Sequence, residues 1–241
     1  MVLRFFILAV AFLLSCTSIE RDSVCDEKSV NYNGCVGGGK GNNISSYKTV
    51  KIGSQTWMAE NLNYAAPGSK CGGNDKELKD KNTSICDTYG RLYNWATAMD
   101  LPANCNFNSC AIGAKHRGIC PIGWHIPSDD DWNTLIKIVN PSCSDNEDCD
   151  GAGTDLKATS GWTSSNGVPS GSNKHGFSAL PGGFGYSDNN FSSVGNDGNW
   201  WSSSEFSSDY AYSRRMNYYN KTVNYSNGEK SYFFSVRCVQ D

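Results

Sequence analysis

The sequence lacks the residue patterns of several common protein classes. No basic cluster stands out and the formal net charge is −3, so the electrostatic footprint of a nucleic-acid-binding protein is missing. No C-x-x-C pair occurs, which disfavours a zinc ribbon or zinc finger. There is no G-x-S-x-G, no H-E-x-x-H and no phosphate-binding loop. Leucine is sparse, whereas Gly, Ser, Asn, Tyr and Trp are plentiful, which is typical of an exported, loop-rich protein with β-structure.

The N-terminus carries a short apolar segment, from Phe5 to Leu14, after one positive charge at Arg4. It is shorter than the ~20 apolar residues that span a bilayer, but it has the length of the apolar core of a secretory signal. Its end, Leu-Leu-Ser followed by Cys16, resembles the bacterial lipobox, in which the peptide is cut before a cysteine that then carries the lipid. We therefore expect a lipoprotein signal peptide over residues 1–15 and a lipid (palmitate) anchor on Cys16. An ordinary signal peptide cut elsewhere, or a short anchor, is the alternative.

The residues after Cys16 indicate where the protein resides and where its folded part begins. Thr17, in place of an aspartate, favours the outer membrane over the inner membrane. Residues 16–46 are polar, include GGGKGNN and show no apolar periodicity, so we interpret them as a lipidated flexible tether. The folded domain is expected over residues 47–241, a length that suits one domain with its own core.

The chain has 11 cysteines, and ten remain if Cys16 carries the lipid. An even number in an exported protein predicts disulfides, although the sequence does not fix their connectivity. Spacing suggests four local pairs: Cys25–Cys35, Cys71–Cys86, Cys105–Cys110 and Cys143–Cys149. Cys120 and Cys238 are then left over and would join the middle of the chain to its end.

The first half of the domain predicts a hairpin and two helices. Residues 50–52 and 55–58 alternate around Gly53-Ser54 and predict a hairpin, and residues 59–62 predict a short helical turn. In residues 89–99, apolar side chains recur at i, i+3, i+4 and i+7, which predicts an amphipathic helix. The same spacing recurs after Ser128 and predicts a second helix ending near Val139.

Three consecutive aspartates, Asp129 to Asp131, stand at the start of this second helix. A metal or acid/base site is one interpretation, since His125 precedes them. However, consecutive helical residues point about 100° apart and do not converge on one ion. Ser128 suits the N-cap, Asp131 can reach back to it as in a capping box, and acidic residues in the first turn face the positive end of the helix dipole. We therefore predict that the aspartates stabilise the helix.

A second acidic stretch, residues 146–151, partly matches the start of a calcium-binding loop. The bidentate Glu expected at its twelfth position is Lys157, and a Cys143–Cys149 bridge would distort it. A solvated acidic loop is therefore favoured over an irregular calcium site, and no metal or cofactor is expected.

From Gly176 onward the signals are those of strands and turns. Residues 199–205 follow an Asn-Asp-Gly turn, and in residues 210–218 Tyr210, Tyr212, Arg214, Met216 and Tyr218 alternate with mostly polar residues. Residues 223–225 predict a short strand, residues 226–229 a turn, and residues 231–239 a closing strand with one apolar face. The order of these elements predicts an α+β protein in which two helices pack on an antiparallel sheet, with long disulfide-bounded loops.

Several stretches together resemble one family, and they occur in its order along nearly all of residues 47–241. They are VKIGSQTWMAENLNY, YGRLYNWATAM, CPIGWHIPSDDDWNTL, LKATSGW, GFSALPGGF, WWSSSE and FSVRCV. The chain is identified by them as a member of the Fibrobacter succinogenes major paralogous domain family. The loops at 65–86, 102–118 and 141–152 lie outside the strongest motifs.

The resemblance implies a fold and a location but no reaction. It implies an exported bacterial domain, frequently on lipoproteins, with a fold similar to C-type lectins and to formylglycine-generating sulfatase-modifying proteins. In such folds the last strand lies beside the first, and a cysteine from the middle bridges to it, a role that Cys120 and Cys238 match. The family's biochemical function is largely unassigned.

We expect a surface-exposed, non-catalytic binding or adhesion domain, with polysaccharide or a cell-surface protein as partner and the membrane reached through the lipid. Exposed aromatic rings stack on sugars, and polar side chains bind their hydroxyls. The candidates lie in the second half of the chain: Trp200, Trp201, Glu205, Tyr210, Tyr212, Arg214 and Tyr218. Core packing is the competing interpretation for each, because in a strand only one of two adjacent tryptophans faces a single core.

Two other functions compete with this one. The enzymatic relatives use reactive cysteines, whereas every cysteine here has a plausible disulfide partner, so we do not expect an enzyme. The Glu-Pro-Asn, Gln-Pro-Asp and Trp-Asn-Asp motifs of calcium-dependent sugar-binding lectins are absent. A structural or protein-binding role in the cell envelope is the remaining alternative.

Overall fold

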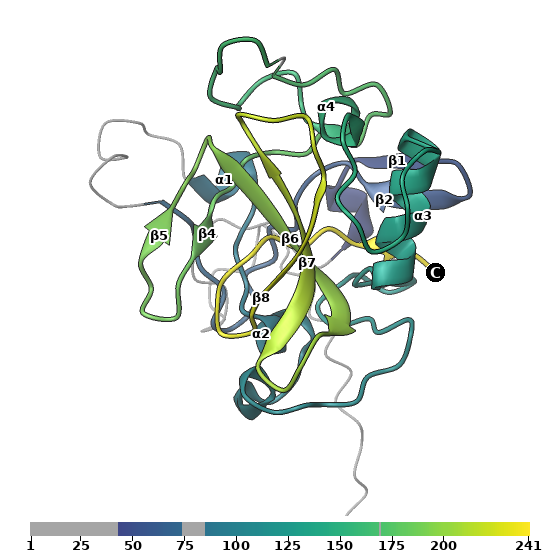
Figure 1. The fold of residues 1–241 in the computed structure, drawn as a ribbon. Helices are drawn as coiled ribbons and strands as arrows, with labels where there is room; N and C mark the ends of the chain where they lie inside the picture. Colours follow the sequence, from purple (N-terminus) through teal and green to yellow (C-terminus); the bar gives the residue numbers. More distant parts are fainter. Residues whose placement is uncertain (1–42, 74–84, 169) are drawn as a thin grey trace, which may run out of the picture. The chain divides into compact units, whose positions relative to one another are not determined.

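The computed structural model describes residues 43–73, 85–168 and 170–241, which form a mixed α+β domain. Within these residues no helix has the length and apolar character needed to cross a membrane. The predicted signal peptide, Cys16, the tether up to residue 42 and the Cys25–Cys35 pair lie outside the described residues. Figure 1 shows the arrangement of the elements.

The helices are short, apart from one. They are η1 (Ile44–Ser46), α1 (Ile85–Tyr89), α2 (Trp95–Ala98), η2 (Ala103–Asn106), α3 (Asp129–Val139) and α4 (Ala152–Leu156), where η denotes a 3-10 helix. The strands are β1 (Thr49–Ile52), β2 (Gln55–Met58), β3 (Trp124–His125), β4 (Phe184–Gly185), β5 (Phe191–Ser192), β6 (Asp197–Glu205), β7 (Tyr210–Asn217), β8 (Asn224–Glu229) and β9 (Val239–Gln240).

The predicted first hairpin is confirmed, with Val50 opposite Trp57. Its sheet has the strand order β1-β2-β9-β3, and all its pairs are antiparallel. The last strand, β9, therefore lies between β2 and β3, where Val239 is the partner of both Trp57 and His125.

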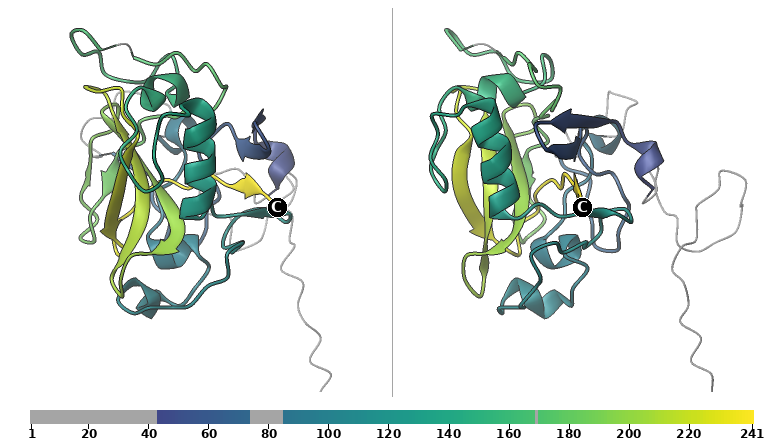
Figure 2. Two further views of the ribbon diagram at one scale, coloured as in Figure 1. Left: turned by 45° about the vertical axis from the view of Figure 1, so that its right-hand side comes forward. Right: turned by 90° about the vertical axis from the view of Figure 1, so that its right-hand side faces the viewer.

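The longest strands form a second antiparallel sheet, β6-β7-β8, and β6 has a core on each face. Trp200 packs in a cluster with α3 and the first hairpin, whereas Trp201 packs in a cluster around α2 and the segment after β3. Figure 2 shows α3 between this sheet and the first hairpin. Because adjacent residues of a strand point to opposite faces, both tryptophans are fully buried.

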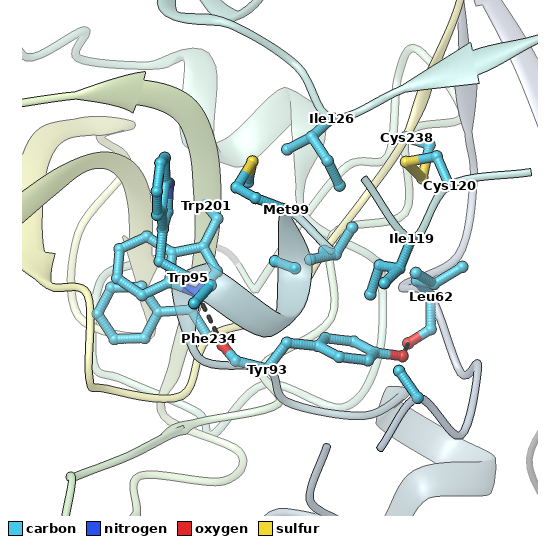
Figure 3. Packing of buried hydrophobic residues seen from close by; sticks show 14 of the residues in the cluster. Leu62, Tyr93, Trp95, Met99, Ile119, Cys120, Ile126, Trp201, Phe234 and Cys238 are labelled. Carbon is cyan, nitrogen blue, oxygen red and sulfur yellow. Dashed lines mark hydrogen bonds between the residues drawn. A yellow bond between two sulfur atoms is a disulfide. The ribbon is translucent and has the colours of Figure 1, made fainter. Parts of the chain in front are cut away.

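The core around Trp201 combines apolar packing with satisfied polar groups (Figure 3). The Trp201 ring stacks on Phe234 at 4.2 Å between ring centroids, and its Nε1 donates to the Tyr93 carbonyl at 2.8 Å. The Tyr93 hydroxyl donates to the Leu62 and Tyr64 carbonyls, so a fully buried tyrosine leaves no polar atom without a partner.

The predicted helix after Ser128 is confirmed together with its cap. The Ser128 side chain accepts from the Asp131 backbone N–H, and the Asp131 carboxylate accepts from the Ser128 backbone N–H at 2.9 Å, which completes a capping box. The apolar face of α3, which includes Trp132, Leu135 and Ile136, is buried.

Four of the predicted disulfides are present: Cys71–Cys86, Cys105–Cys110, Cys120–Cys238 and Cys143–Cys149. The Cys120–Cys238 bond spans 118 residues and ties the segment before β3 to the residue before β9. It therefore fastens the central strand of the first sheet to a distant part of the chain.

Four predictions about local structure are wrong. Residues 59–62 are not helical, and the helix expected over residues 89–99 is confined to Trp95–Ala98. Gly90 interrupts the latter with a φ of +78°, and Leu92 then bridges to Lys70. Residues 226–229 continue β8 instead of turning, because they pair with β7. The closing stretch has no single apolar face: both parities of residues 233–239 are buried, since the segment passes between two cores.

Candidate functional site

The two predicted tryptophan ligands do not reach the surface. Trp200 and Trp201 are both 0% exposed, and each indole N–H is used inside the protein. Trp200 Nε1 donates to Asn61 Oδ1 at 2.9 Å. Neither ring presents a face on which a sugar can stack, so both belong to the core.

Arg214 is also buried, and it organises the base of the β7–β8 surface. Its Nη1 lies 3.0 Å from Asp129 Oδ1, and its Nη2 donates to Asn133 Oδ1 at 3.1 Å. Its guanidinium lies over the Tyr225 ring, 4.6 Å from the centroid, and the Tyr225 hydroxyl donates to Asp129 Oδ2. Arg214 therefore positions an aromatic side chain and is not itself placed to contact a ligand.

Glu205 has a structural role as well. Its Oε1 lies 2.6 Å from Lys230 Nζ and accepts from the Cys110 backbone N–H at 2.9 Å. Lys230 is fully buried over the Trp95 ring and donates to two further carbonyls. The buried ammonium thus joins the β6 end, the Cys105–Cys110 loop and α2.

A row of three rings lies on the same face as Arg214: the exposed Phe206 and the half-buried Tyr212 and Tyr225. We call it the aromatic face. The Phe206 and Tyr212 centroids are 5.4 Å apart in an edge-to-face arrangement, and those of Tyr212 and Tyr225 are 5.2 Å apart at an interplanar angle of 29°. Phe206 is 54% exposed, so its ring is open to solvent at the end of this row.

The strand register explains why these rings meet. Tyr225 lies opposite Arg214, and Tyr212 lies opposite Asn227, so Tyr212 and Tyr225 are diagonal neighbours on one face. Sequence alternation identified Tyr212 but missed Tyr225, because the register of β8 on β7 is a long-range property. Phe206 was missed because it lies in the turn before β7, outside the alternating stretch.

The pKa of Tyr225 supports the same arrangement. Burial raises the pKa of its hydroxyl most, and the neighbouring Tyr212 and Asp129 raise it further. The hydroxyl therefore remains a proton donor to Asp129 at neutral pH, which fixes the ring above Arg214.

The remaining candidates lie beside or away from the aromatic face. Tyr210 is half-buried, and its hydroxyl donates to Glu229 Oε1 on the neighbouring strand at 3.5 Å. Tyr218 packs against the exposed Tyr219 at the far end of β7. The structure therefore brings Tyr212 into the aromatic face and leaves Tyr218 outside it.

The acidic stretch after α3 is occupied by internal contacts. Asp148 accepts from the Tyr225 backbone N–H at 2.8 Å and from Asn224 Nδ2, so it caps the outer edge of β8. Asp145 pairs with Lys137. Within the described part of the chain no group of three or more His, Cys, Asp or Glu side chains could hold a metal ion.

His125 lies between two carboxylates. Its Nδ1 is 2.7 Å from Asp241 Oδ1 and its Nε2 is 3.3 Å from Asp131 Oδ2, while its side chain is 2% exposed. Burial alone would lower the pKa of His125, but the hydrogen bonds and charges of Asp131 and Asp241 together raise it. The imidazole therefore fastens the end of the chain to the start of α3.

The comparison with known families identifies the family of this chain. The family described as Fibrobacter succinogenes major domain matches residues 50–240. The chain belongs to this family. No curated protein and no solved structure matches it. The matched range includes residues of all three sheets, α3 and the aromatic face, so the Fibrobacter succinogenes major domain includes every candidate residue of the second half.

Proposed function

We propose that this Fibrobacter succinogenes major domain is a non-catalytic binding domain, displayed on the bacterial surface by a lipid on Cys16, and that its aromatic face contacts polysaccharide. The support for display is the lipobox-like sequence at the end of residues 1–15. A C-type-lectin-like arrangement is part of this proposal. It is supported by the position of β9 beside the first hairpin and by the Cys120–Cys238 bond.

The observation that carries the proposal is a buried ion pair beneath the half-buried Tyr225 ring, in a row of rings that ends at the exposed Phe206. Arg214 is 1% exposed and forms an ion pair with Asp129. Stability alone does not explain this pair, because an apolar pair of similar volume is often as stable as a buried ion pair. The ion pair instead fixes the position of Tyr225, because Arg214 lies against the Tyr225 ring and Asp129 accepts a hydrogen bond from its hydroxyl. A preorganised aromatic surface loses little side-chain entropy when it binds a ligand.

A carbohydrate suits this surface. The apolar face of a sugar ring can stack on Phe206, while the Tyr212 hydroxyl and the exposed Asn227 can bind hydroxyl groups. The eight described cysteines are all paired in disulfides, which leaves none of them as a nucleophile. A non-catalytic role is therefore favoured over one based on reactive thiols.

Binding of the oxidised protein to a polysaccharide and glycan array, with calcium and with chelator, tests the proposal. We expect Phe206→Ala to weaken binding about tenfold, or about 1.4 kcal/mol, which is the size of one aromatic contact, without lowering the melting temperature. Tyr219→Ala is the matched control, because Tyr219 is equally exposed at 52% but lies outside the aromatic face. Chelator should have no effect.

Equal weakening by both substitutions would contradict the proposal, as would binding that survives Phe206→Ala unchanged. The alternative is a structural or protein-binding role in the cell envelope. It would be favoured if no saccharide bound and cross-linking on intact cells captured an envelope protein through the aromatic face.

A further inference from the structure

A cleft of about 730 Å³ lies beside β1, and several of its lining residues belong to the sequence motifs of residues 50–64 and 176–184. Its walls come from the start of β1, the segment after β2, α1 and the loop at 176–180. The volume lies within the range of small-molecule sites, roughly 300–1,000 Å³. It shares no residue with the aromatic face.

The floor of the cleft is rigid. Asn61 lines it, and its side chain uses all of its main hydrogen-bonding groups: Oδ1 accepts from Trp200 Nε1 and from Arg237 Nη2, and Nδ2 donates to the Tyr89 carbonyl. Gly90 closes tightly against this segment, since an added Cβ would lie 2.8 Å from Asn61 Cβ. The floor therefore cannot rearrange to fill the space.

Asn63, two residues further on, is different. It also lines the cleft and is 5% exposed, but its Oδ1 has no hydrogen-bond partner. A buried acceptor without a partner is unfavourable, and native proteins satisfy nearly all such groups. A ligand that donates a hydrogen bond would remove this cost, which is a reason for a ligand at this wall and not only for empty space.

The chemistry of the walls selects the class of ligand. One lysine, Lys48, and two carboxylates, Glu60 and Asp87, line the cleft, so the lining carries no large charge of one sign. Thr49 and Thr88 add hydroxyl groups at the exposed rim. The walls therefore offer both hydrogen-bond donors and hydrogen-bond acceptors. They hold no cluster of like charges, and the described residues include no metal-binding group. Such a lining fits a ligand that carries many uncharged hydroxyls.

We propose that this cleft binds a neutral, hydroxyl-rich ligand, a short saccharide or the end of a saccharide chain. One ligand hydroxyl donates to Asn63 Oδ1 after a rotation of the Asn63 side chain, because this oxygen is buried in the structure. The site is separate from the aromatic face and does not depend on it. On a displayed domain the two sites would hold different parts of a polysaccharide, the end in the cleft and the chain on the rings.

The test is a titration of the oxidised, ¹⁵N-labelled protein with neutral trisaccharides of glucose, xylose, mannose or galactose, up to about 50 mM so that millimolar Kd values are covered. We expect one trisaccharide to shift the side-chain amide resonance of Asn63. Thr88→Phe, which places a ring at the exposed rim, should weaken that binding at least about tenfold. Thr159→Phe is the control, because Thr159 is also exposed and lies outside the cleft.

The outcomes separate the two sites. The cleft proposal is supported if Thr88→Phe loses trisaccharide binding while Thr159→Phe and Phe206→Ala retain it. The cleft proposal is overturned if Phe206→Ala loses trisaccharide binding while Thr88→Phe retains it, and the aromatic face is then the binding site. Absence of binding by every neutral trisaccharide, or binding of an acidic trisaccharide alone, also overturns it.

Discussion

Replacing the three consecutive aspartates of α3 one at a time should lower stability by three different amounts. Asp130 is exposed and interacts with the helix dipole, so Asp130→Ala should cost about 0.3–1 kcal/mol. Asp131 accepts from the Ser128 backbone N–H at 2.9 Å and from Ser128 Oγ at 2.6 Å. Because hydrogen bonds to a charged group are worth about 1.5–3 kcal/mol, Asp131→Ala should cost about 2–3 kcal/mol.

Asp129 should matter most. It forms the ion pair with Arg214, whose side chain is 1% exposed, and it accepts from the Tyr225 hydroxyl. Removing one partner of a buried pair leaves an uncompensated charge and costs about 3–5 kcal/mol. Asp129→Ala should therefore be the least stable of the three variants.

The measurement is urea unfolding of the oxidised proteins at neutral pH, followed by tryptophan fluorescence and extrapolated linearly to water. We expect Asp130→Ala to have the highest unfolding free energy of the three variants, Asp131→Ala an intermediate value and Asp129→Ala the lowest. Three losses that agree within about 0.5 kcal/mol would mean that only the helix dipole matters and would refute the distinct roles. Full stability together with lost ligand binding would instead identify the acidic run as a binding site.

Three further predictions follow from buried contacts. The carboxylates beside His125 raise its pKa above the ordinary 6.5, so their contribution to the free energy of unfolding is complete below about pH 6.5 and declines as the pH rises through the raised pKa. His125→Gln should therefore flatten this part of a curve of unfolding free energy against pH. Replacing Cys120 and Cys238 together by Ala should cost about 2–5 kcal/mol in thermal or urea unfolding, because their bond closes a loop of 118 residues; a loss below about 1 kcal/mol would contradict this role. Gly198→Ala should cost about 1–3 kcal/mol, because its Cβ would lie 2.3 Å from a buried tryptophan ring, whereas Gly113→Ala, with open space around it, should leave the melting temperature unchanged.

Apart from the Cys120–Cys238 disulfide, most features that the sequence predicted correctly depend on neighbouring residues. The cap at Ser128, the helix behind it and the first hairpin each follow from residues within a few positions. The helix expected over residues 89–99 failed because Leu92 and Tyr93 bridge to distant segments, and these long-range pairs override the local apolar spacing.

The candidate site shows the same division. Tyr212 was identified from alternation along one strand, whereas Tyr225 reaches the aromatic face only through the register of β8 on β7. Arg214 was taken for a ligand residue because an arginine in an aromatic strand suits sugar binding. Its burial follows from Asp129, which is 85 residues away in sequence, so no local pattern could have shown it.

The place of β9 in the first sheet has a consequence for the order of folding. The hairpin of residues 49–58 gains its inner neighbour only when residues 239–240 have been synthesised. A growing chain can form the hairpin early, but its sheet has to wait for β9, the last strand of the domain. The first sheet is therefore completed only after nearly the whole domain has been synthesised.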